Sequence, residues 1–182
     1  VITGLNAGNA ILAALLHKER TGEIMRIDLS LWDCAIAALV NQAHNAMASG
    51  KNPTPMGSAH PNLVPYRAFE AKDGWFVIGV GSDNQWLTLV EALALENQES
   101  WATNEGCVNS RKAVESCVEN AVLNYNRGEL EQKLIGVPCA PVNTVLEALH
   151  DPQSVARQAV TDFQGVDVLA SPLRFMQPSK RE

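Results

Sequence analysis

A long stretch rich in glycine and proline, Ala48–Pro65, constrains the fold of this chain more than any other feature. It holds two glycines and four prolines among small polar residues, a composition that can continue neither a helix nor a central strand. The residues before it are patterned as helices, whereas the residues after it are patterned as a hairpin, helices and short strands. Long loops of this kind are usually functional or linkers. We therefore expect it to mark a boundary between two parts of the chain.

The part before this stretch is expected to contain two helices and a strand. Asn6–Arg20 has apolar residues at helical spacing, and Gly22 is placed to end that helix. Met25–Leu29 alternates apolar and polar residues, which predicts a strand. Ser30 is expected to cap a long helix that ends near Met47. Its run Ala35–Val40 is apolar nearly all round, so we expect that run to be buried or packed against a partner chain.

The part after the stretch reads as α+β. Tyr66–Ala71 and Trp75–Val80 flank an Asp-Gly turn and predict a β-hairpin. Glu96–Asn109 is weakly patterned and is assigned no element. Further helices are expected at Asn84–Ala94, Ser110–Tyr125, Glu129–Ile135, Thr144–His150 and Gln153–Ala159, with strand-like segments at Cys139–Val142 and Val160–Phe175. This mixed order of elements is typical of the α+β class.

Composition excludes several functional classes. With 182 residues and 46% hydrophobic residues, the chain can form one core and a small second unit. Its formal net charge of −6 argues against a nucleic-acid surface, and no apolar run approaches the roughly 20 residues of a membrane span. The four cysteines are widely spaced, which favours reduced thiols in a cytoplasmic protein. The four histidines are too far apart to predict a metal site.

One glycine pattern leaves a nucleotide-binding alternative open. Gly79–Asn84 lies between an expected strand and an expected helix, as a dinucleotide fingerprint would. Asn84 stands where the third glycine belongs, and the preceding strands read as a hairpin rather than a βαβ unit. The pattern therefore favours an ordinary strand-to-helix turn, with Asp83 as the helix N-cap.

The loop Gly50–Tyr66 permits two interpretations. A loop rich in glycine and proline that contains a histidine and precedes a tyrosine could close over a ligand. Its composition alone favours a linker between domains.

Several short blocks resemble motifs of class III CoA-transferases and occur in that family's order. Thr21-Gly22 followed by Arg26–Leu31 resembles the segment TG-x-G-x-x-(V/I)-D-x-SL. Gly57–Pro61 followed by Pro65-Tyr66 resembles the loop G-N-x-HP-x-x-x-PY. Further matching blocks are the hairpin residues Ala71–Gly81 with Gln85-Trp86, the GVP-x-APV block Gly136–Val142, and the DPQ block Asp151–Gln153. Ser58 departs from the family, which usually has Asn there.

The resemblance implies part of a large domain followed by a small α+β domain with a β-hairpin and flanking helices. The expected boundaries are 1–50 for a helical segment of the large domain or linker, 51–65 for the loop, 66–159 for the small domain, and 160–182 for a segment returning toward the large domain. It also implies five substrate-loop candidates: Gly57, Ser58, His60, Pro61 and Tyr66. For His60 we expect a hydrogen bond that fixes the loop rather than direct chemistry.

In this family the nucleophilic Asp and most CoA-binding residues lie upstream of the TG-x-G segment. No Asp or Glu of this chain matches that nucleophile by motif, and Asp28 and Asp73 match positions that we interpret as structural. We therefore expect an internal-to-C-terminal portion that is inactive alone, with no catalytic, cofactor-binding or metal-binding residue of its own. Coenzyme A would be a substrate of the full-length family.

The expected partners are a second copy of the chain or the missing large domain, and neither nucleic acid nor a membrane. Three alternatives stay open: a non-catalytic self-associating module, a fragment of an acyl-CoA racemase, and a nucleotide-binding domain at Gly79–Asn84.

Overall fold

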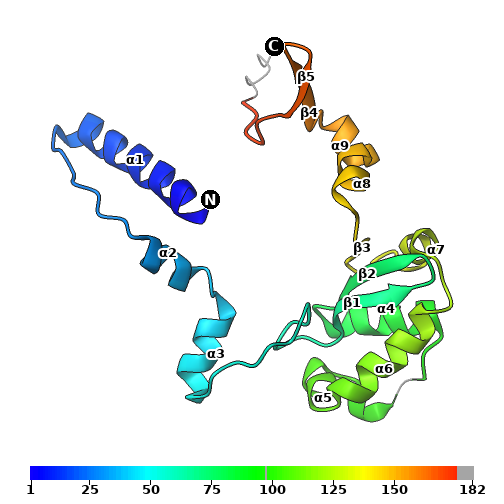
Figure 1. The fold of residues 1–182 in the computed structure, drawn as a ribbon. Helices are drawn as coiled ribbons and strands as arrows, with labels where there is room; N and C mark the ends of the chain where they lie inside the picture. Colours follow the sequence, from blue (N-terminus) through cyan, green and yellow to red (C-terminus); the bar gives the residue numbers. More distant parts are fainter. Residues whose placement is uncertain (97, 176–182) are drawn as a thin grey trace, which may run out of the picture. The chain divides into compact units, whose positions relative to one another are not determined.

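The computed structural model describes residues 1–96 and 98–175. It divides into two compact units, Val1–Gly57 and Ser58–Glu182 (Figure 1). The division falls inside the glycine- and proline-rich stretch.

The first unit consists of three helices. They are α1 (Ile2–Thr21), α2 (Leu31–Ala37) and α3 (Asn41–Ser49). Helix α1 ends as predicted at Gly22, which takes the left-handed conformation with φ 78°. Helices α1 and α2 contact each other, and the side-chain amide of Asn6 donates to Cys34 Sγ at 3.6 Å. Cys34 is the sole buried hydrophobic residue among residues 1–57.

Two predictions for this unit are wrong. Met25–Leu29 is not a strand, because the described residues offer it no neighbouring strand to complete a ladder. The helix that begins after Ser30 does not run unbroken to Met47, because Val40 has φ 47° and ψ −120°, which lie outside the helical region. The Ser30 cap itself is confirmed, since its side chain accepts from the Asp33 N–H at 3.0 Å. Within the described chain, Ala35–Val40 is exposed.

The second unit is built on a three-stranded antiparallel sheet in the order β1-β2-β3. The strands are β1 (Tyr66–Ala71), β2 (Gly74–Gly79) and β3 (Cys139–Pro141). The predicted hairpin is confirmed to within a residue, with Phe69 opposite Phe76. Phe69, Ala71, Phe76 and Ile78 are buried, whereas Glu70 and Trp75 are exposed. The strands therefore bury one face and leave the other more open.

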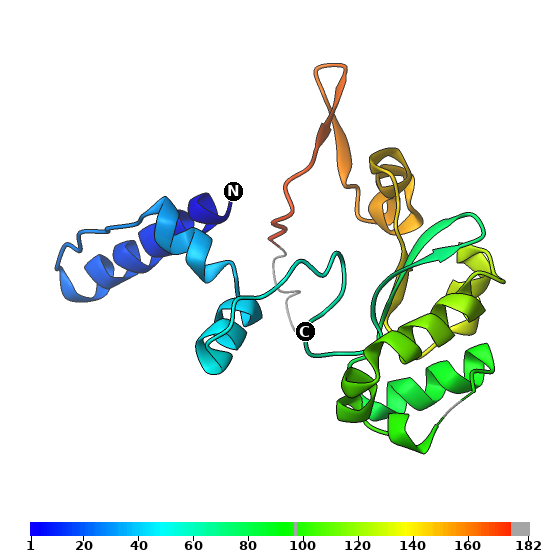
Figure 2. The same cartoon turned by 60° about the horizontal axis from the view of Figure 1, so that its bottom comes forward.

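Helices cover the buried face of this sheet. They are α4 (Asp83–Leu93), the 3₁₀ turn η1 (Glu99–Trp101), α5 (Asn104–Asn109), α6 (Arg111–Val122) and α7 (Arg127–Lys133). Figures 1 and 2 show α4 and α6 on the same side of the sheet. Their apolar stripes, including Leu89, Val114, Val118 and Val122, share one core with Phe69 and the other inward strand residues. The result is the predicted α+β fold, in which one helical layer packs on one sheet.

The C-terminal part of the second unit adds α8 (Val145–His150), α9 (Pro152–Ala156) and a hairpin of β4 (Val160–Phe163) and β5 (Val166–Leu169). None of the described residues from 142 to 175 is buried. Arg127 connects this part to the sheet, because its guanidinium lies 3.7 Å from Asp73 and 3.4 Å from Glu147.

Sequence patterning missed two elements and misplaced one cap. The turn η1 and helix α5 lie in a segment to which we assigned no element. The N-cap of α4 is Ser82, whose side chain accepts from the Gln85 N–H at 3.4 Å, and not Asp83. In the described part of the chain, no helix is long and apolar enough to cross a membrane.

Candidate active-site loop

The loop Ser58–Pro65 folds back on the beginning of β1. Ser58 Oγ accepts from the Ala68 N–H at 3.0 Å, and the His60 N–H donates to the Tyr66 carbonyl at 2.9 Å. At the far end, the Val80 N–H donates to the Pro65 carbonyl at 2.9 Å. These bonds attach both ends of the loop to the sheet.

Aromatic stacking joins the loop to the hairpin. The rings of His60 and Tyr66 stack with centroids 5.2 Å apart and planes 25° apart. Tyr66 lies opposite Gly79 across the strands, and its ring passes 3.2 Å from the point where a β-carbon of Gly79 would be. His60 Nδ1 accepts from the Asn62 N–H at 3.1 Å, so the neutral ring carries its proton on Nε2. The expected hydrogen-bonding role of His60 is therefore present in the geometry.

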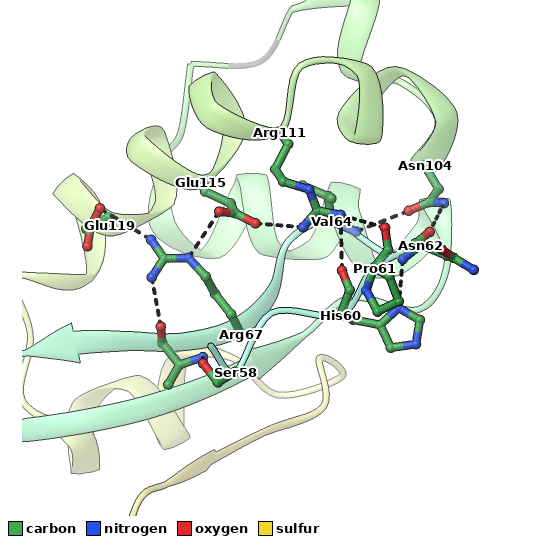
Figure 3. Close-up of polar contacts among 11 residues, drawn as sticks. Ser58, His60, Pro61, Asn62, Val64, Arg67, Asn104, Arg111, Glu115 and Glu119 are labelled. Carbon is green, nitrogen blue, oxygen red and sulfur yellow. Dashed lines mark hydrogen bonds and ion pairs between the residues drawn. The ribbon is translucent and has the colours of Figure 1, made fainter. Parts of the chain in front are cut away.

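Two side chains from the helical layer hold the loop from its other side (Figure 3). Arg111 Nη2 donates to the carbonyls of His60 and Pro61, at 3.0 and 2.8 Å. Asn104 Nδ2 donates to the Asn62 carbonyl at 2.9 Å. The loop is thus anchored to helices as well as to the sheet.

The arginine that holds the loop belongs to a network of four charged side chains. Arg111 Nη1 lies 3.0 Å from Glu115 Oε1, and Arg67 Nε lies 3.3 Å from the second oxygen of the same carboxylate. Arg67 also reaches Glu119 at 3.3 Å, and its guanidinium lies 4.3 Å from the centroid of the Phe69 ring. Arg67 and Arg111 each form an ion pair with one oxygen of the Glu115 carboxylate, so both oxygens of Glu115 serve the network.

The structure brings together four of the five predicted loop residues. Ser58, His60, Pro61 and Tyr66 lie within one hydrogen-bonded and stacked group in the second unit. Gly57 belongs to the first unit, is exposed, and has φ 60°, a conformation that favours glycine.

Sequence analysis missed the residues that hold this group. Asn104, Arg111 and Gly79 were not among the candidates, although Gly79 appeared in the glycine pattern considered for nucleotides. No local pattern marks Asn104 or Arg111, because their acceptors are backbone carbonyls distant in sequence.

The glycine pattern at Gly79–Asn84 forms a strand-to-helix turn. The preceding strand β2 is antiparallel to both its neighbours, so it lacks the parallel crevice of a dinucleotide fold. The Gly81 N–H, which would face a phosphate in such a fold, donates instead to Gln85 Oε1 at 2.8 Å.

The cysteines of the second unit are poor nucleophiles. Burial raises the pKa of Cys107 to about 11, and burial also raises the pKa of Cys117 and of Cys139. Because the thiolate is the reactive form, these three side chains are essentially protonated near neutral pH. All four cysteines are free. Over residues 1–96 and 98–175, no group of three or more His, Cys, Asp or Glu is arranged to hold a metal ion.

The two carboxylates that match family motifs have different surroundings. Asp73 Oδ1 accepts from the Arg127 N–H at 2.8 Å, and this hydrogen bond ties the hairpin turn to the start of α7. Asp28, expected at a strand end, lies in a segment without strand structure.

Comparison with known proteins places this geometry in a family. The sequence model that describes CoA-transferase family III matches residues 1–181 of this chain. The chain is 33% identical to a succinate–glutarate CoA-transferase of Agrobacterium fabrum, over all of this chain and 50% of that protein. It is 31% identical to the human succinyl-CoA:glutarate CoA-transferase, over 89% of this chain and 38% of that one. The chain therefore belongs to CoA-transferase family III, and it spans half or less of the length of these relatives.

Solved structures agree with this assignment. A CAIB/BAIF family protein from Brucella suis is 42% identical, with a TM-score of 0.74 over 96% of this chain and 48% of that chain. Rv3272 from Mycobacterium tuberculosis is 20% identical with a TM-score of 0.81, and it supports the fold alone.

Proposed function

We propose that this chain is a portion of a class III CoA-transferase, made of a segment of the large domain or linker and the small domain, and that the parent protein moves CoA between carboxylic acids. The observation that carries the proposal is the family membership of the whole chain, together with the anchored loop at the position of the family's G-N-x-HP motif. In the parent reaction, an Asp carboxylate attacks the acyl-CoA thioester and releases the CoA thiolate, which leaves a mixed anhydride on the enzyme. The thiolate then attacks the aspartyl carbonyl of this anhydride, which forms an enzyme thioester and releases the donor acid.

The loop is proposed to form part of the acyl side of the substrate pocket. Ser58, His60 and Tyr66 supply a hydroxyl, an imidazole and a phenol in a segment whose backbone is fixed at both ends. Fixed polar groups of this kind orient a substrate without a large cost in entropy. Two relatives named for succinate and glutarate suggest short dicarboxylic acids as the acyl groups.

The 182 residues are proposed to be inactive alone. The family's nucleophilic Asp and its nucleotide-binding residues belong to motifs upstream of Thr21-Gly22, and no motif in this chain supplies them. The formal net charge of −6 also disfavours binding of the CoA phosphates by this chain. Free cysteines accord with a cytoplasmic location.

The test measures transfer of CoA from succinyl-CoA to glutarate, using the purified chain, the Agrobacterium fabrum relative and a chimaera. In the chimaera this chain replaces the half of the relative that it matches. We expect no glutaryl-CoA from the chain and glutaryl-CoA from both the relative and the chimaera. Activity of the isolated chain, or a folded chimaera of the relative's size that does not transfer CoA, would overturn the proposal.

A second function, self-association without catalysis, is favoured by one observation. Helix α1 exposes apolar side chains that share one face at helical spacing, with Leu5 66%, Leu12 67% and Leu15 57% exposed. Exposed apolar surface of this extent marks an interaction site. Light scattering at rising concentration should show dimers or larger species, and Leu12→Glu with Leu15→Glu should shift them toward monomer. A monomeric wild-type chain at high concentration would exclude this function.

A further inference from the structure

Three consecutive carbonyls of the loop are all held by the helical layer. Arg111 Nη2 donates hydrogen bonds to the carbonyls of His60 and Pro61, and Asn104 Nδ2 donates to the carbonyl of Asn62. Backbone carbonyls outside regular structure need such partners when water is displaced. The loop conformation therefore depends on two side chains that lie far from it in sequence.

Asn104 contacts the loop as a neighbouring strand would. Its Nδ2 donates to Asn62 O at 2.9 Å, while its Oδ1 accepts from the Val64 N–H at 3.2 Å. In a parallel ladder, one residue forms the same two hydrogen bonds to its neighbouring strand, one to a carbonyl and one to the N–H two residues later. Asn104 is fixed in turn, because its own N–H donates to Asp83 Oδ1 at 3.0 Å.

Arg111 is oriented by its neighbours rather than by the loop alone. Glu115 lies one helical turn later on α6, and its Oε1 accepts from Arg111 Nη1 at 3.0 Å. Arg111 Nη2 therefore remains available to donate to the loop carbonyls. Arg67 on β1 holds the other oxygen of Glu115 at 3.3 Å. One terminal nitrogen of the guanidinium thus bonds to a carboxylate and the other to two carbonyls. The single nitrogen of a lysine ammonium cannot reproduce this arrangement.

Figure 3 shows the His60 ring on the side of the loop away from Arg111 and Asn104. We propose that Arg111 and Asn104 are positioning residues, which fix the backbone of Ser58–Val64 and thereby set where Ser58 and His60 stand. Their functional consequence rests on the proposed function, in which this loop lines the acyl side of the pocket.

The first test follows the loop in the isolated chain, whether or not the chain is active. Amide hydrogen exchange is measured by NMR for wild type, Arg111→Met, Arg111→Lys and Asn104→Ala, with Lys112→Met as the matched control. Lys112 is the exposed neighbour of Arg111 on α6. The buried amides of Leu130 and Leu134, on the far helix α7 and at its end, report on the core.

We expect the His60 and Val64 amides to exchange about tenfold faster in Arg111→Met and in Asn104→Ala, because each variant removes hydrogen bonds that hold the loop. Arg111→Lys should give an intermediate increase, and Lys112→Met should give none. Exchange at Leu130 and Leu134 should stay unchanged in all four variants. Loop exchange equal to wild type in Arg111→Met and Asn104→Ala, or an equal increase in loop and core, would overturn the positioning role.

The second test separates this inference from the proposed function. In the active chimaera, Arg111→Met should raise the KM for glutarate about tenfold while kcat changes by less than about threefold, since a misplaced loop weakens acceptor binding. Faster loop exchange with an unchanged KM would overturn the assignment of the loop to the acyl side, and with it the functional half of the inference. A chimaera that is inactive before any substitution would instead overturn the proposed function.

Discussion

The ring of Tyr66 lies flat over Gly79, its partner across the β1–β2 ladder, and leaves 3.2 Å to the point where a β-carbon would be. Glycine is thus favoured at this position by a side chain rather than by the backbone, since the φ of Gly79 lies outside the left-handed region. The Tyr66 ring also stacks on the His60 ring, with centroids 5.2 Å apart. The glycine is therefore what allows an aromatic ring to connect the loop to the sheet.

Gly79→Val should destabilise the second unit through Tyr66. The added side chain overfills the space under the ring, and overpacking costs about 1–3 kcal/mol. Urea unfolding measures the loss, and Tyr66→Ala provides the control background. In Tyr66→Ala the valine should cost at least about 1 kcal/mol less, because the obstructing ring is gone. Equal costs in the two backgrounds would show that Tyr66 is not the reason for the glycine.

A second glycine, Gly106 in α5, is confined by backbone rather than by a side chain. A β-carbon there would collide with the carbonyl oxygen of Ser100, which cannot rotate away as a side chain could. Gly106→Ala should therefore destabilise the chain by about 2 kcal/mol or more. Gly128 of α7 is the matched control, because nothing lies within 4 Å of its added β-carbon.

The two alanine variants should move stability in opposite directions. Gly128→Ala should stabilise the chain by about 0.5–1 kcal/mol, the usual gain from glycine to alanine in a helix. Thermal unfolding of both variants beside the wild type makes the comparison. A Gly106→Ala variant as stable as Gly128→Ala would mean that the contact with Ser100 is relieved at little cost.

Much of the second unit could be predicted from sequence because its signals are local. The hairpin is specified by an Asp-Gly turn between alternating residues, and α6 by apolar residues that return every turn, including Val114 and Val118. Helix α5 was missed because its six residues are mostly polar and include a glycine, so no apolar period emerges. It is defined instead by a cap, with Thr103 Oγ1 accepting from the Gly106 N–H at 3.2 Å.

The candidate site was predictable only in part, for a related reason. The loop residues themselves are contiguous, and a family motif marks them. The residues that hold the loop are not contiguous with it: Arg111 reaches His60 across 51 positions, and Asn104 reaches Asn62 across 42. The acceptors are backbone carbonyls, which every residue type has, so no pairing of residue types reveals the contact. In the first unit, the non-helical backbone of Val40, with φ 47°, divides a helix that its apolar pattern predicted to be continuous.

The stability of the capping box of α8 should depend on pH, because it requires the Glu147 carboxylate to be ionised. Thr144 accepts from the Glu147 N–H at 3.3 Å, and Glu147 Oε2 accepts from the Thr144 N–H at 2.7 Å. The backbone hydrogen bond from Thr144 is the main cause that lowers the pKa of Glu147 from its ordinary value of 4.5, with smaller help from the Thr144 side chain and Arg127. A lowered folded-state pKa means that the carboxylate stabilises the cap above pH 4.5 and that this support is lost as the pH falls through the lowered value.

An NMR titration of the Thr144 amide checks this dependence. Its chemical shift should change with a midpoint below pH 4.5 in the wild type and should lose that transition in Glu147→Gln. Arg127→Met and Thr144→Ala should each move the midpoint upward, because each removes a side chain that lowers this pKa. A midpoint at or above 4.5 would contradict the hydrogen-bonded geometry of the cap.

The thiol of Cys107 should resist alkylation as long as the second unit is folded. Burial is the main cause that raises its pKa to about 11, with a further contribution from the charge of Asp83, and its Sγ donates to the Trp101 carbonyl at 3.3 Å. At pH 9 an unperturbed thiol of pKa 9.0 is half ionised, whereas a thiol of pKa about 11 is about 1% ionised. Protonation alone should therefore slow the reaction with iodoacetamide about fiftyfold relative to the chain in urea, and exclusion of the reagent should slow it further. Mass spectrometry of the peptide that contains Cys107 measures both rates. A native rate within about fivefold of the urea rate would show that the segment from η1 to α5 opens to solvent far more often than its buried contacts allow.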